Sequence, residues 1–347
     1  MTTRTVHPSY APRPQAPRPG AGRRTLRAVA LAATLPYLTL KAAWLAGSRT
    51  GIPDGSVLAE PGTFLVLANS VTLLMDACVI VLVLLLTQPW GMRVPSWLLT
   101  VPAFVASGLL TPILLGFPGQ LLIRAIGFGA DPSGSAQREP FLDPWVFNVV
   151  YGGFIVQGLA LAGLFVPYAR ERWGWGRSRS RFADRPAGGA ERETAFTRPA
   201  ESVRATASTR VVATAAALGS AGVAAAYFFW AFGGTAGMGA ERAASWSAEA
   251  GVVSAVHAVC ALAAGTGALL LASDRGRRAW WPAALAWIGS GAALGWGLWP
   301  LIASLGPQLD GGEAPSGASQ LIYAGQMATG ALAAVVLTRF LTRRSEG

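Results

Sequence analysis

The sequence is poor in charge and in side chains that bind metals. Only 13% of its 347 residues are charged and 52% are hydrophobic, whereas about 25% of the residues of an ordinary soluble domain are charged. This composition indicates a membrane protein. Because the whole chain contains two histidines, a membrane haem with paired histidine ligands and a His-Glu-x-x-His zinc site are excluded. We therefore expect no cofactor and no metal ion.

Two further classes of protein are disfavoured by what is missing. The chain has no Gly-x-x-x-x-Gly-Lys loop, so we expect it not to use ATP directly. Its two cysteines, Cys78 and Cys260, lie in apolar segments without Cys-x-x-Cys spacing, which favours buried apolar side chains over a disulfide or a zinc site.

The net charge is +11, but the basic residues flank apolar segments, where they act as orientation signals. We expect no nucleic-acid partner.

Eight apolar segments are long enough to cross a bilayer as helices. They lack the period-two alternation of a barrel strand, and backbone groups in lipid must be hydrogen-bonded within their own segment. The predicted fold class is therefore all-α, a polytopic helical membrane protein whose surroundings are the lipid bilayer. The segments cover residues 26–46, 64–87, 97–115, 145–166, 211–232, 251–272, 281–303 and 320–337.

Composition divides the chain into five regions. Residues 1–24 combine proline with arginine and predict a disordered basic tail. Residues 169–210 hold ten arginines without apolar periodicity and predict a flexible linker. The first four segments occupy residues 25–168, the last four occupy residues 211–341, and residues 342–347 form a short second tail.

The distribution of arginine predicts the orientation in the membrane. Of the 27 arginines, 23 lie in the two tails or in loops on the same side as the tails, and four lie in the opposite loops. Short basic loops stay in the cytoplasm. We therefore expect a multi-pass protein of the bacterial cytoplasmic membrane, with both termini and the linker in the cytoplasm.

The start of the linker has the composition of a segment that contacts lipid headgroups. Two tryptophans stand among four arginines there, and each arginine near an anionic surface gains about 1 kcal/mol. The alternative is a general basic anchor without lipid specificity. The four arginines are Arg172, Arg177, Arg179 and Arg181.

Two patterns of residues recur along the chain in the same order. A tryptophan, a glycine three positions later and a second glycine four positions after that end the first segment and, 186 residues further on, the fifth; these residues are Trp44, Gly47 and Gly51, and Trp230, Gly233 and Gly237. A tyrosine followed by two glycines recurs in the fourth and eighth segments, as Tyr151, Gly153 and Gly158, and Tyr323, Gly325 and Gly330. An even number of segments per copy brings both copies into the membrane from the same side. We predict two parallel four-helix repeats, related by a pseudo-two-fold axis along the membrane normal.

The second copy of the tryptophan pattern carries a resemblance. The stretch Trp230-Ala-Phe-Gly-Gly-Thr, in which the last three residues are Gly233, Gly234 and Thr235, resembles the Trp-x-x-Gly-Gly-Thr signature of a bacterial family of small four-span membrane proteins, a domain of unknown function. The resemblance covers the second half of the chain and implies a four-span unit there. The first half departs from it, because Ser48 and Arg49 replace the second glycine and the threonine. The resemblance implies architecture alone.

Few polar side chains stand inside the apolar segments, and these are the candidate functional residues. Asn69, Thr72 and Asp76 follow i, i+3, i+7 spacing and so form one stripe on a helix. Lys41 lies five residues before the end of the first segment, where it either extends toward the membrane surface or reaches inward to Asp76. Ionisable groups in a membrane are functional candidates because their insertion is costly.

The second half has a comparable stripe. His257 stands in the sixth segment, with Ser254 three positions before it. One hypothesis is that Lys41, Asp76 and His257 line a shared cavity between the repeats and bind a proton or a small polar ligand. The alternative is that all are structural residues, satisfied by neighbouring helices.

The sequence identifies no catalytic set, so we favour a non-enzymatic role. The first interpretation is a carrier or transporter of a lipid or a small lipophilic molecule, which predicts a polar cavity between the repeats. The second is a membrane scaffold for a partner protein that the sequence does not identify, and it predicts filled interfaces between the repeats. The third, a membrane-embedded enzyme, predicts a polar cleft that joins Asp76 or the carboxylates of the outer loops to the surface.

Overall fold

The computed structural model describes residues 20–54, 56, 58, 62–128, 142–173, 199–273, 280–304 and 314–345. Within these residues the regular structure is helical, with eight long helices and two short ones. The long helices are α1 (Ala21–Leu45), α2 (Thr63–Thr87), α3 (Ser96–Ala125), α4 (Pro144–Trp173), α5 (Pro199–Ala231), α7 (Ala248–Ala272), α8 (Trp281–Ala303) and α9 (Gly317–Ser345), and the short ones are η1 (Pro89–Met92) and α6 (Ala240–Ala244).

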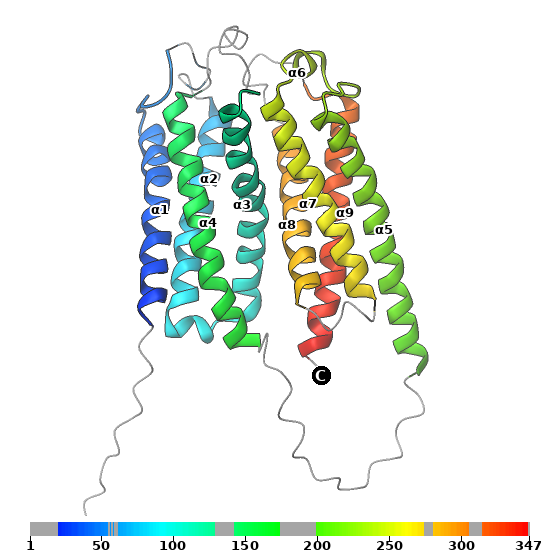
Figure 1. The fold of residues 1–347 in the computed structure, drawn as a ribbon. Coiled ribbons are helices and arrows are strands. Elements are labelled where there is room, and N and C mark those ends of the chain that lie inside the picture. The colour runs from blue at the N-terminus through cyan, green and yellow to red at the C-terminus, as the bar shows by residue number, and fades with distance from the viewer. Residues whose placement is uncertain are drawn as a thin grey trace, which may run out of the picture.

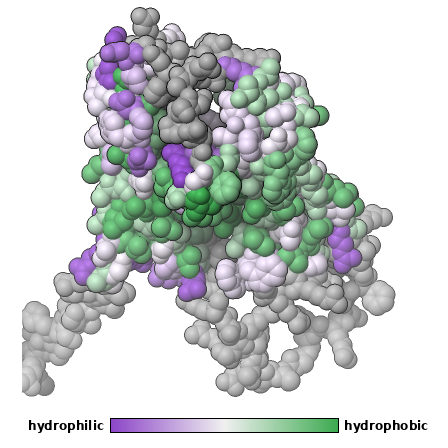
Figure 2. Space-filling view, turned by 45° about the horizontal axis from the view of Figure 1, so that its top comes forward, coloured by the Kyte–Doolittle hydropathy of each residue, from purple (hydrophilic) through white to green (hydrophobic). Residues whose placement is uncertain are grey.

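The eight long helices are apolar enough and long enough to span a membrane. The shortest, α8, has 23 residues, which at 1.5 Å per residue corresponds to about 35 Å. Large apolar side chains are exposed on several of the helices, such as Leu67, Leu218 and Leu321. Figure 2 shows hydrophobic residues over the middle of the visible face and hydrophilic ones nearer its upper and lower edges. By helix length and hydropathy, the chain is therefore a multi-pass membrane protein.

The eight predicted helices are confirmed, although several are longer than expected. Helix α3 continues ten residues past position 115, through Pro118, because proline in a membrane helix is tolerated where other groups satisfy the freed carbonyl. Helix α1 begins at Ala21, so Arg23 and Arg24 are helical. Residues 1–19 of the predicted tail and residues 174–198 of the predicted linker lie outside the described residues.

The helices form two groups of four that stand side by side (Figure 1). We call α1–α4 the first half and α5–α9 the second half. One end of the bundle, here called the corner end, holds the loops that follow Trp44 and Trp230 together with α6. The opposite end, here called the linker end, holds the start of α1, the end of α4, the start of α5 and the end of α9 (Figure 1).

The second half is packed more tightly than the first. In the second half α7 packs along α5 and α8, and α9 packs along α8, α5 and α7. Glycines allow this approach, because a Cβ on Gly289 would lie 2.2 Å from the Ala264 backbone nitrogen and one on Gly330 would lie 2.6 Å from that of Leu294. Small residues at such contacts let membrane helices meet backbone to backbone.

The first half is built mainly on α1, which packs against α2 and α4, while α2 makes fewer contacts with α3 and α4. Its apolar core lies toward the linker end and includes Leu82, Val83, Leu86 and Leu164. On the corner side of Asp76, the described side chains of α2 are all exposed or half-buried. Helix α2 is thus well packed over only its linker-side half.

The two halves meet where α3 packs against α7 and α8. Gly108 and Gly291 bring the backbones of α3 and α8 together, because a Cβ on Gly108 would lie 2.3 Å from the Gly291 carbonyl carbon. Two indole groups add hydrogen bonds across this contact: Trp287 Nε1 donates to Ser107 Oγ at 2.8 Å, and Trp296 Nε1 donates to the Leu109 carbonyl at 3.1 Å. The interface between the halves is therefore filled at this contact.

An ion pair joins the two halves at the corner end. The Arg124 guanidinium donates two hydrogen bonds of 2.6 Å to the Glu249 carboxylate. Arg124 stands in the last turn of α3 and Glu249 in the first turn of α7. The pair therefore also places a negative charge at a helix N-terminus, where it is favourable.

The two cysteines differ in burial. Cys260 is buried, as expected, but Cys78 is exposed on α2. The expectation for Cys78 was wrong because it stands on the face of α2 that is turned away from the other helices.

Exchanging Gly108 for alanine is expected to weaken the contact between the halves. The added Cβ would meet the Gly291 backbone, and overpacking of this kind costs about 1–3 kcal/mol. Thermal unfolding of the purified protein in detergent should give a lower Tm than the wild type. Gly116→Ala, in the same helix, is the control because nothing lies within 4 Å of its Cβ. Equal stability of the two variants would contradict the prediction.

Candidate functional site

The pattern that follows α1 forms a tight helix-ending corner. The Ser48 backbone nitrogen donates to the Ala43 carbonyl at 2.8 Å, and that of Gly47 donates to the Trp44 carbonyl at 3.0 Å. This pair of hydrogen bonds is the Schellman motif, which requires a left-handed residue, and Gly47 has φ of 88°. The Trp44 indole nitrogen then donates to the Thr50 carbonyl at 2.8 Å. The loop is thereby held against the helix that it leaves.

The pattern that follows α5 forms the same corner. The Gly234 backbone nitrogen donates to the Phe229 carbonyl at 2.9 Å, and that of Gly233 donates to the Trp230 carbonyl at 3.3 Å. Gly233 has φ of 90°, and the Trp230 indole nitrogen donates to the Ala236 carbonyl at 3.1 Å. Each donor and acceptor stands 186 positions after its counterpart in the first corner.

Each corner is also attached to the start of the last helix of its half. The Gly51 carbonyl accepts a hydrogen bond from the Asp143 backbone nitrogen at 3.0 Å, just before α4. The Gly237 carbonyl accepts from Ser316 Oγ and, at 3.1 Å, from Ser319 Oγ at the start of α9. Both carbonyls belong to glycines with positive φ. The glycines of the pattern therefore have a structural role in joining helices.

The remaining residues of the second corner are likewise structural. A Cβ on Gly234 would lie 2.4 Å from the Phe229 ring, and the Thr235 carbonyl accepts a hydrogen bond from the Met238 nitrogen at 3.0 Å. Trp230 is only 2% exposed. Trp230 packs into the core of its half.

The first half holds a polar cluster between α1, α2 and α4. It begins near the corner end with Lys41, whose Nζ donates to Asn69 Oδ1 at 2.6 Å. The ammonium group also lies 5.2 Å from the centroid of the Tyr37 ring and 5.0 Å from that of Trp44. Both rings attract a cation through their negative faces. In the structure Lys41 therefore bonds to Asn69 and does not reach Asp76.

Asp76 lies deeper in the same half and is 5% exposed. Its Oδ1 accepts a hydrogen bond from Gln157 Nε2 of α4 at 3.3 Å, while its Oδ2 is buried without a hydrogen-bond partner. Tyr37 stands close to Thr72 and interacts electrostatically with Asp76. We define the first-half polar cluster by these residues: Tyr37, Lys41, Asn69, Thr72, Asp76 and Gln157.

The second half holds a polar cluster whose members contact one another. The Tyr227 hydroxyl donates to Gln326 Oε1 at 2.6 Å, and Gln326 Nε2 lies 3.5 Å from His257 Nδ1. The His257 ring stacks on Tyr227, with centroids 5.2 Å apart, and contacts Trp296 at 5.4 Å. Gln326 is fully buried, and Tyr227 and His257 are nearly so. We call Tyr227, His257, Trp296 and Gln326 the second-half polar cluster.

The structure brings some of the predicted residues together and separates others. Lys41 meets Asn69, but Asp76 and His257 lie in different halves, each among residues of its own half. The hydroxyls of Thr72 and Ser254 bond to carbonyls of their own helices. Lys41, Asp76 and His257 therefore do not line one cavity between the halves. The reason is that the halves meet through α3, α7 and α8 rather than through the polar faces of α1 and α2.

Five members of these clusters were not predicted from the sequence: Tyr37, Gln157, Tyr227, Trp296 and Gln326. One signal was available: glutamine is rare inside an apolar helix, Gln157 is the only glutamine in its predicted segment, and the one other glutamine in the segment of Gln326 is Gln320, its first residue.

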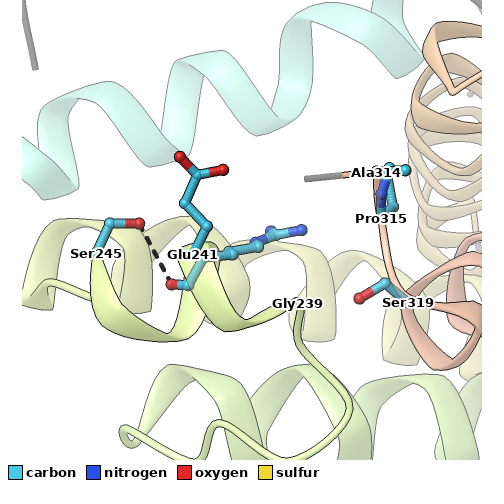
Figure 3. A pocket seen from close by; sticks show the side chains of 7 residues that line it. Gly239, Glu241, Ser245, Ala314, Pro315 and Ser319 are labelled. Atoms are coloured by element: carbon cyan, nitrogen blue, oxygen red, sulfur yellow. Dashed lines mark hydrogen bonds between the residues drawn. The ribbon is translucent and has the colours of Figure 1, made fainter. Parts of the chain in front are cut away.

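A hollow of about 200 Å³ lies at the corner end of the second half, between α6 and the start of α9. Figure 3 shows that the Glu241 side chain points away from Ser319, and that Ser319 lies on the opposite side of the hollow. The Arg242 guanidinium that lines it is bonded to the Tyr323 hydroxyl. The hollow therefore lies between two helices, α6 and α9, that this hydrogen bond joins. Its lining residues are Gly239, Glu241, Arg242, Ser245, Ala314, Pro315 and Ser319.

At the linker end, Arg172 is engaged with protein groups. Its guanidinium donates to the carbonyls of Gly91, Met92 and Val94 at 3.3, 3.1 and 2.7 Å, and to Ser96 Oγ at 3.0 Å. Arg172 thus fastens the loop between α2 and α3. The other predicted lipid-contacting residues, Arg177, Arg179 and Arg181, lie outside the described residues.

Comparison of the chain with protein-family models, with curated proteins and with solved structures finds no match. The resemblance carried by residues 230–237 therefore stays a prediction.

The hydrogen bond between Tyr227 and Gln326 is expected to show coupling in a double-mutant cycle. Tyr227→Phe and Gln326→Leu each leave a buried polar group unpaired, whereas the double variant removes both partners. We expect a coupling free energy of roughly 0.6–1.7 kcal/mol, the range for hydrogen bonds between membrane helices. Unfolding of the four proteins in detergent measures it. Strictly additive effects would show that the cluster is held by packing alone.

Proposed function

We propose that this membrane protein is a carrier of a lipid or a small lipophilic molecule, and that the first-half polar cluster receives the polar group of that molecule. The observation that carries the proposal is the setting of Lys41. Lys41 belongs to the membrane-spanning helix α1, and its ammonium group is bonded to a neutral amide and flanked by two aromatic rings. Among the described residues, no carboxylate lies at ion-pair distance from it.

The packing of α2 supports entry from the lipid. The side chains described between Val66 and Met75 are exposed or half-buried, and Asp76 is the first buried residue counted from the corner end. An apolar chain can therefore lie along this part of α2 while its head reaches Lys41 and Asn69. A cation that is held only by a neutral amide and two ring faces keeps its positive charge uncompensated, so a carboxylate or phosphate headgroup suits it.

We further infer that the two halves arose by duplication and are arranged as parallel repeats. The matching hydrogen bonds of the two corners support this inference, because they recur at one offset of 186 positions. The arginine-rich tails and linker support an orientation with the linker end in the cytoplasm of a bacterial cell. In that orientation, Lys41 lies nearer to the outer surface of the membrane than to the cytoplasmic surface.

A scaffold for a partner protein is the second candidate. It is favoured by the filled contact between the halves at Gly108 and Gly291, since a transport path between the halves would need space there. The two candidates differ in what accompanies the purified protein, a small ligand or a second protein.

Replacing Lys41 by methionine is expected to remove the ligand. A charge-assisted hydrogen bond is worth about 1.5–3 kcal/mol, so the affinity should fall by roughly 10- to 100-fold. Native mass spectrometry of the protein in gentle detergent would measure the fraction that carries a bound lipid-sized mass.

The matched control is Thr39→Val, two residues away in α1. The Thr39 hydroxyl is exposed and bonds only to the carbonyls of Leu35 and Pro36 in its own helix, so this variant should keep the ligand. Equal occupancy in Lys41→Met and the wild type would refute the site, and a co-purifying protein in place of a small ligand would favour the scaffold.

A further inference from the structure

We propose that Asp76 is a proton-binding site that exchanges its proton with the corner side of the membrane and is sealed from the linker side. The proposal concerns the cluster on which the proposed function rests, but proton binding requires no transported ligand. The two ideas can therefore fail separately.

The hydrogen bonding of Asp76 is incomplete. One carboxyl oxygen, Oδ1, accepts from Gln157 Nε2 at 3.3 Å, and the other, Oδ2, is buried without a partner. A buried ionised carboxylate needs a cation or several donors. Because Gln157 supplies one donor and leaves Oδ2 unpaired, the arrangement suits a carboxyl group that carries its proton on Oδ2.

The groups that face Asp76 do not compensate a negative charge. From α1 come Tyr37, which interacts with Asp76, and Lys41, which bonds instead to Asn69. From α4 come Gln157 and Tyr151, the latter interacting with Tyr37. The one charged residue of α3, Arg124, is paired with Glu249. In the described part of the chain, no basic nitrogen lies at ion-pair distance from Asp76.

A polar path leads from Asp76 to the corner end. Thr72 stands one turn from Asp76 and Asn69 about two turns, so the stripe covers roughly 10 Å along α2. Both residues are half-buried, and Tyr37 and Lys41 line the same path from α1. Water that enters from the corner end can therefore deliver a proton.

The opposite direction is closed by apolar packing. From Asp76 toward the linker end, α2 presents Leu82, Val83 and Leu86, which are 3%, 0% and 1% exposed and pack with Leu164 of α4 in one core. Beyond this core, Arg23 donates to the Leu86 carbonyl at 2.6 Å and lies 3.5 Å from the Glu171 carboxylate. Asp76 therefore has polar residues on its corner side and closely packed apolar residues on its linker side.

The step itself is a simple proton transfer. A hydronium ion that reaches the cluster loses one proton to Oδ2 and becomes water, while the carboxylate becomes a neutral carboxyl group. Release toward the corner side is the reverse.

A carbodiimide tests the protonated state. Dicyclohexylcarbodiimide adds to a protonated carboxyl in an apolar site and rearranges to a stable N-acylurea, so the full mass of the reagent is added. The full-length protein in phosphatidylcholine vesicles is treated over a range of pH and measured as an intact mass. We expect one adduct that fragmentation places on Asp76 in the wild type and that declines as the pH rises.

Two variants sharpen this test. Asp76→Asn should lose the adduct, and Glu249→Gln, which removes an ion-paired carboxylate at the corner end, should keep it. Placing the adduct in the wild type does not depend on whether Asp76→Asn folds. Absence of an adduct at every pH, or an adduct on another residue, would overturn the assignment of the proton site.

Cysteine accessibility tests the direction of access. In a background with Cys78→Ala and Cys260→Ala, Thr72→Cys should react with a charged, water-soluble thiol reagent, and Val83→Cys should not. Both positions are on α2, on opposite sides of Asp76. Equal reaction of the two would overturn the seal, whereas the carbodiimide result would still stand or fall by itself.

Discussion

Each backbone amide inside a bilayer has to find its hydrogen-bond partner within its own helix, and this constraint shapes the rest of the structure. It makes the spanning segments helical through internal prolines such as Pro112 and Pro300. It also concentrates conformational demands where helices end. Gly47 and Gly233 meet that demand in the same way, with left-handed backbones that satisfy the last carbonyls of α1 and α5. Once the backbone is satisfied, the polar side chains are what distinguish one part of the bundle from another.

The two halves share their corners but differ inside. Position 41 of α1 holds lysine, and the position 186 residues later holds Tyr227. Tyr227 belongs to the second-half polar cluster, in which its hydroxyl bonds to Gln326 and its ring stacks on His257. Lys41 has a single amide partner in its cluster, and Asp76 keeps one oxygen unpaired. Polar groups that are paired with one another hold a cluster rigid, whereas incompletely paired ones leave it able to bind something further.

Packing follows the same division. In the second half, glycines let α7, α8 and α9 approach until a single added Cβ would meet backbone atoms, and the contact of α3 with α8 at Gly108 and Gly291 extends this close packing to one helix of the first half. Helix α2 makes fewer contacts with α3 and α4 than with α1, and it is loosely held over its corner-side portion. Helix α3 is thus packed closely against the second half. The first-half polar cluster lies beside the loosely packed part of α2. This placement is physically reasonable because a site that admits a ligand from lipid has to open between helices.

The sequence by itself determined the eight helices, their approximate limits and the stripe of Asn69, Thr72 and Asp76, because hydropathy and helical period are properties of one segment at a time. It also identified Lys41 and His257 as unusual. Only the tertiary structure decided that Lys41 bonds to Asn69 rather than Asp76, that Gln157 and Gln326 complete the two clusters, and that His257 lies apart from Asp76. It likewise decided that Trp230 is buried and Cys78 exposed. Those outcomes depend on which helices are neighbours and in what register they pack, and neither is encoded in the periodicity of any single segment.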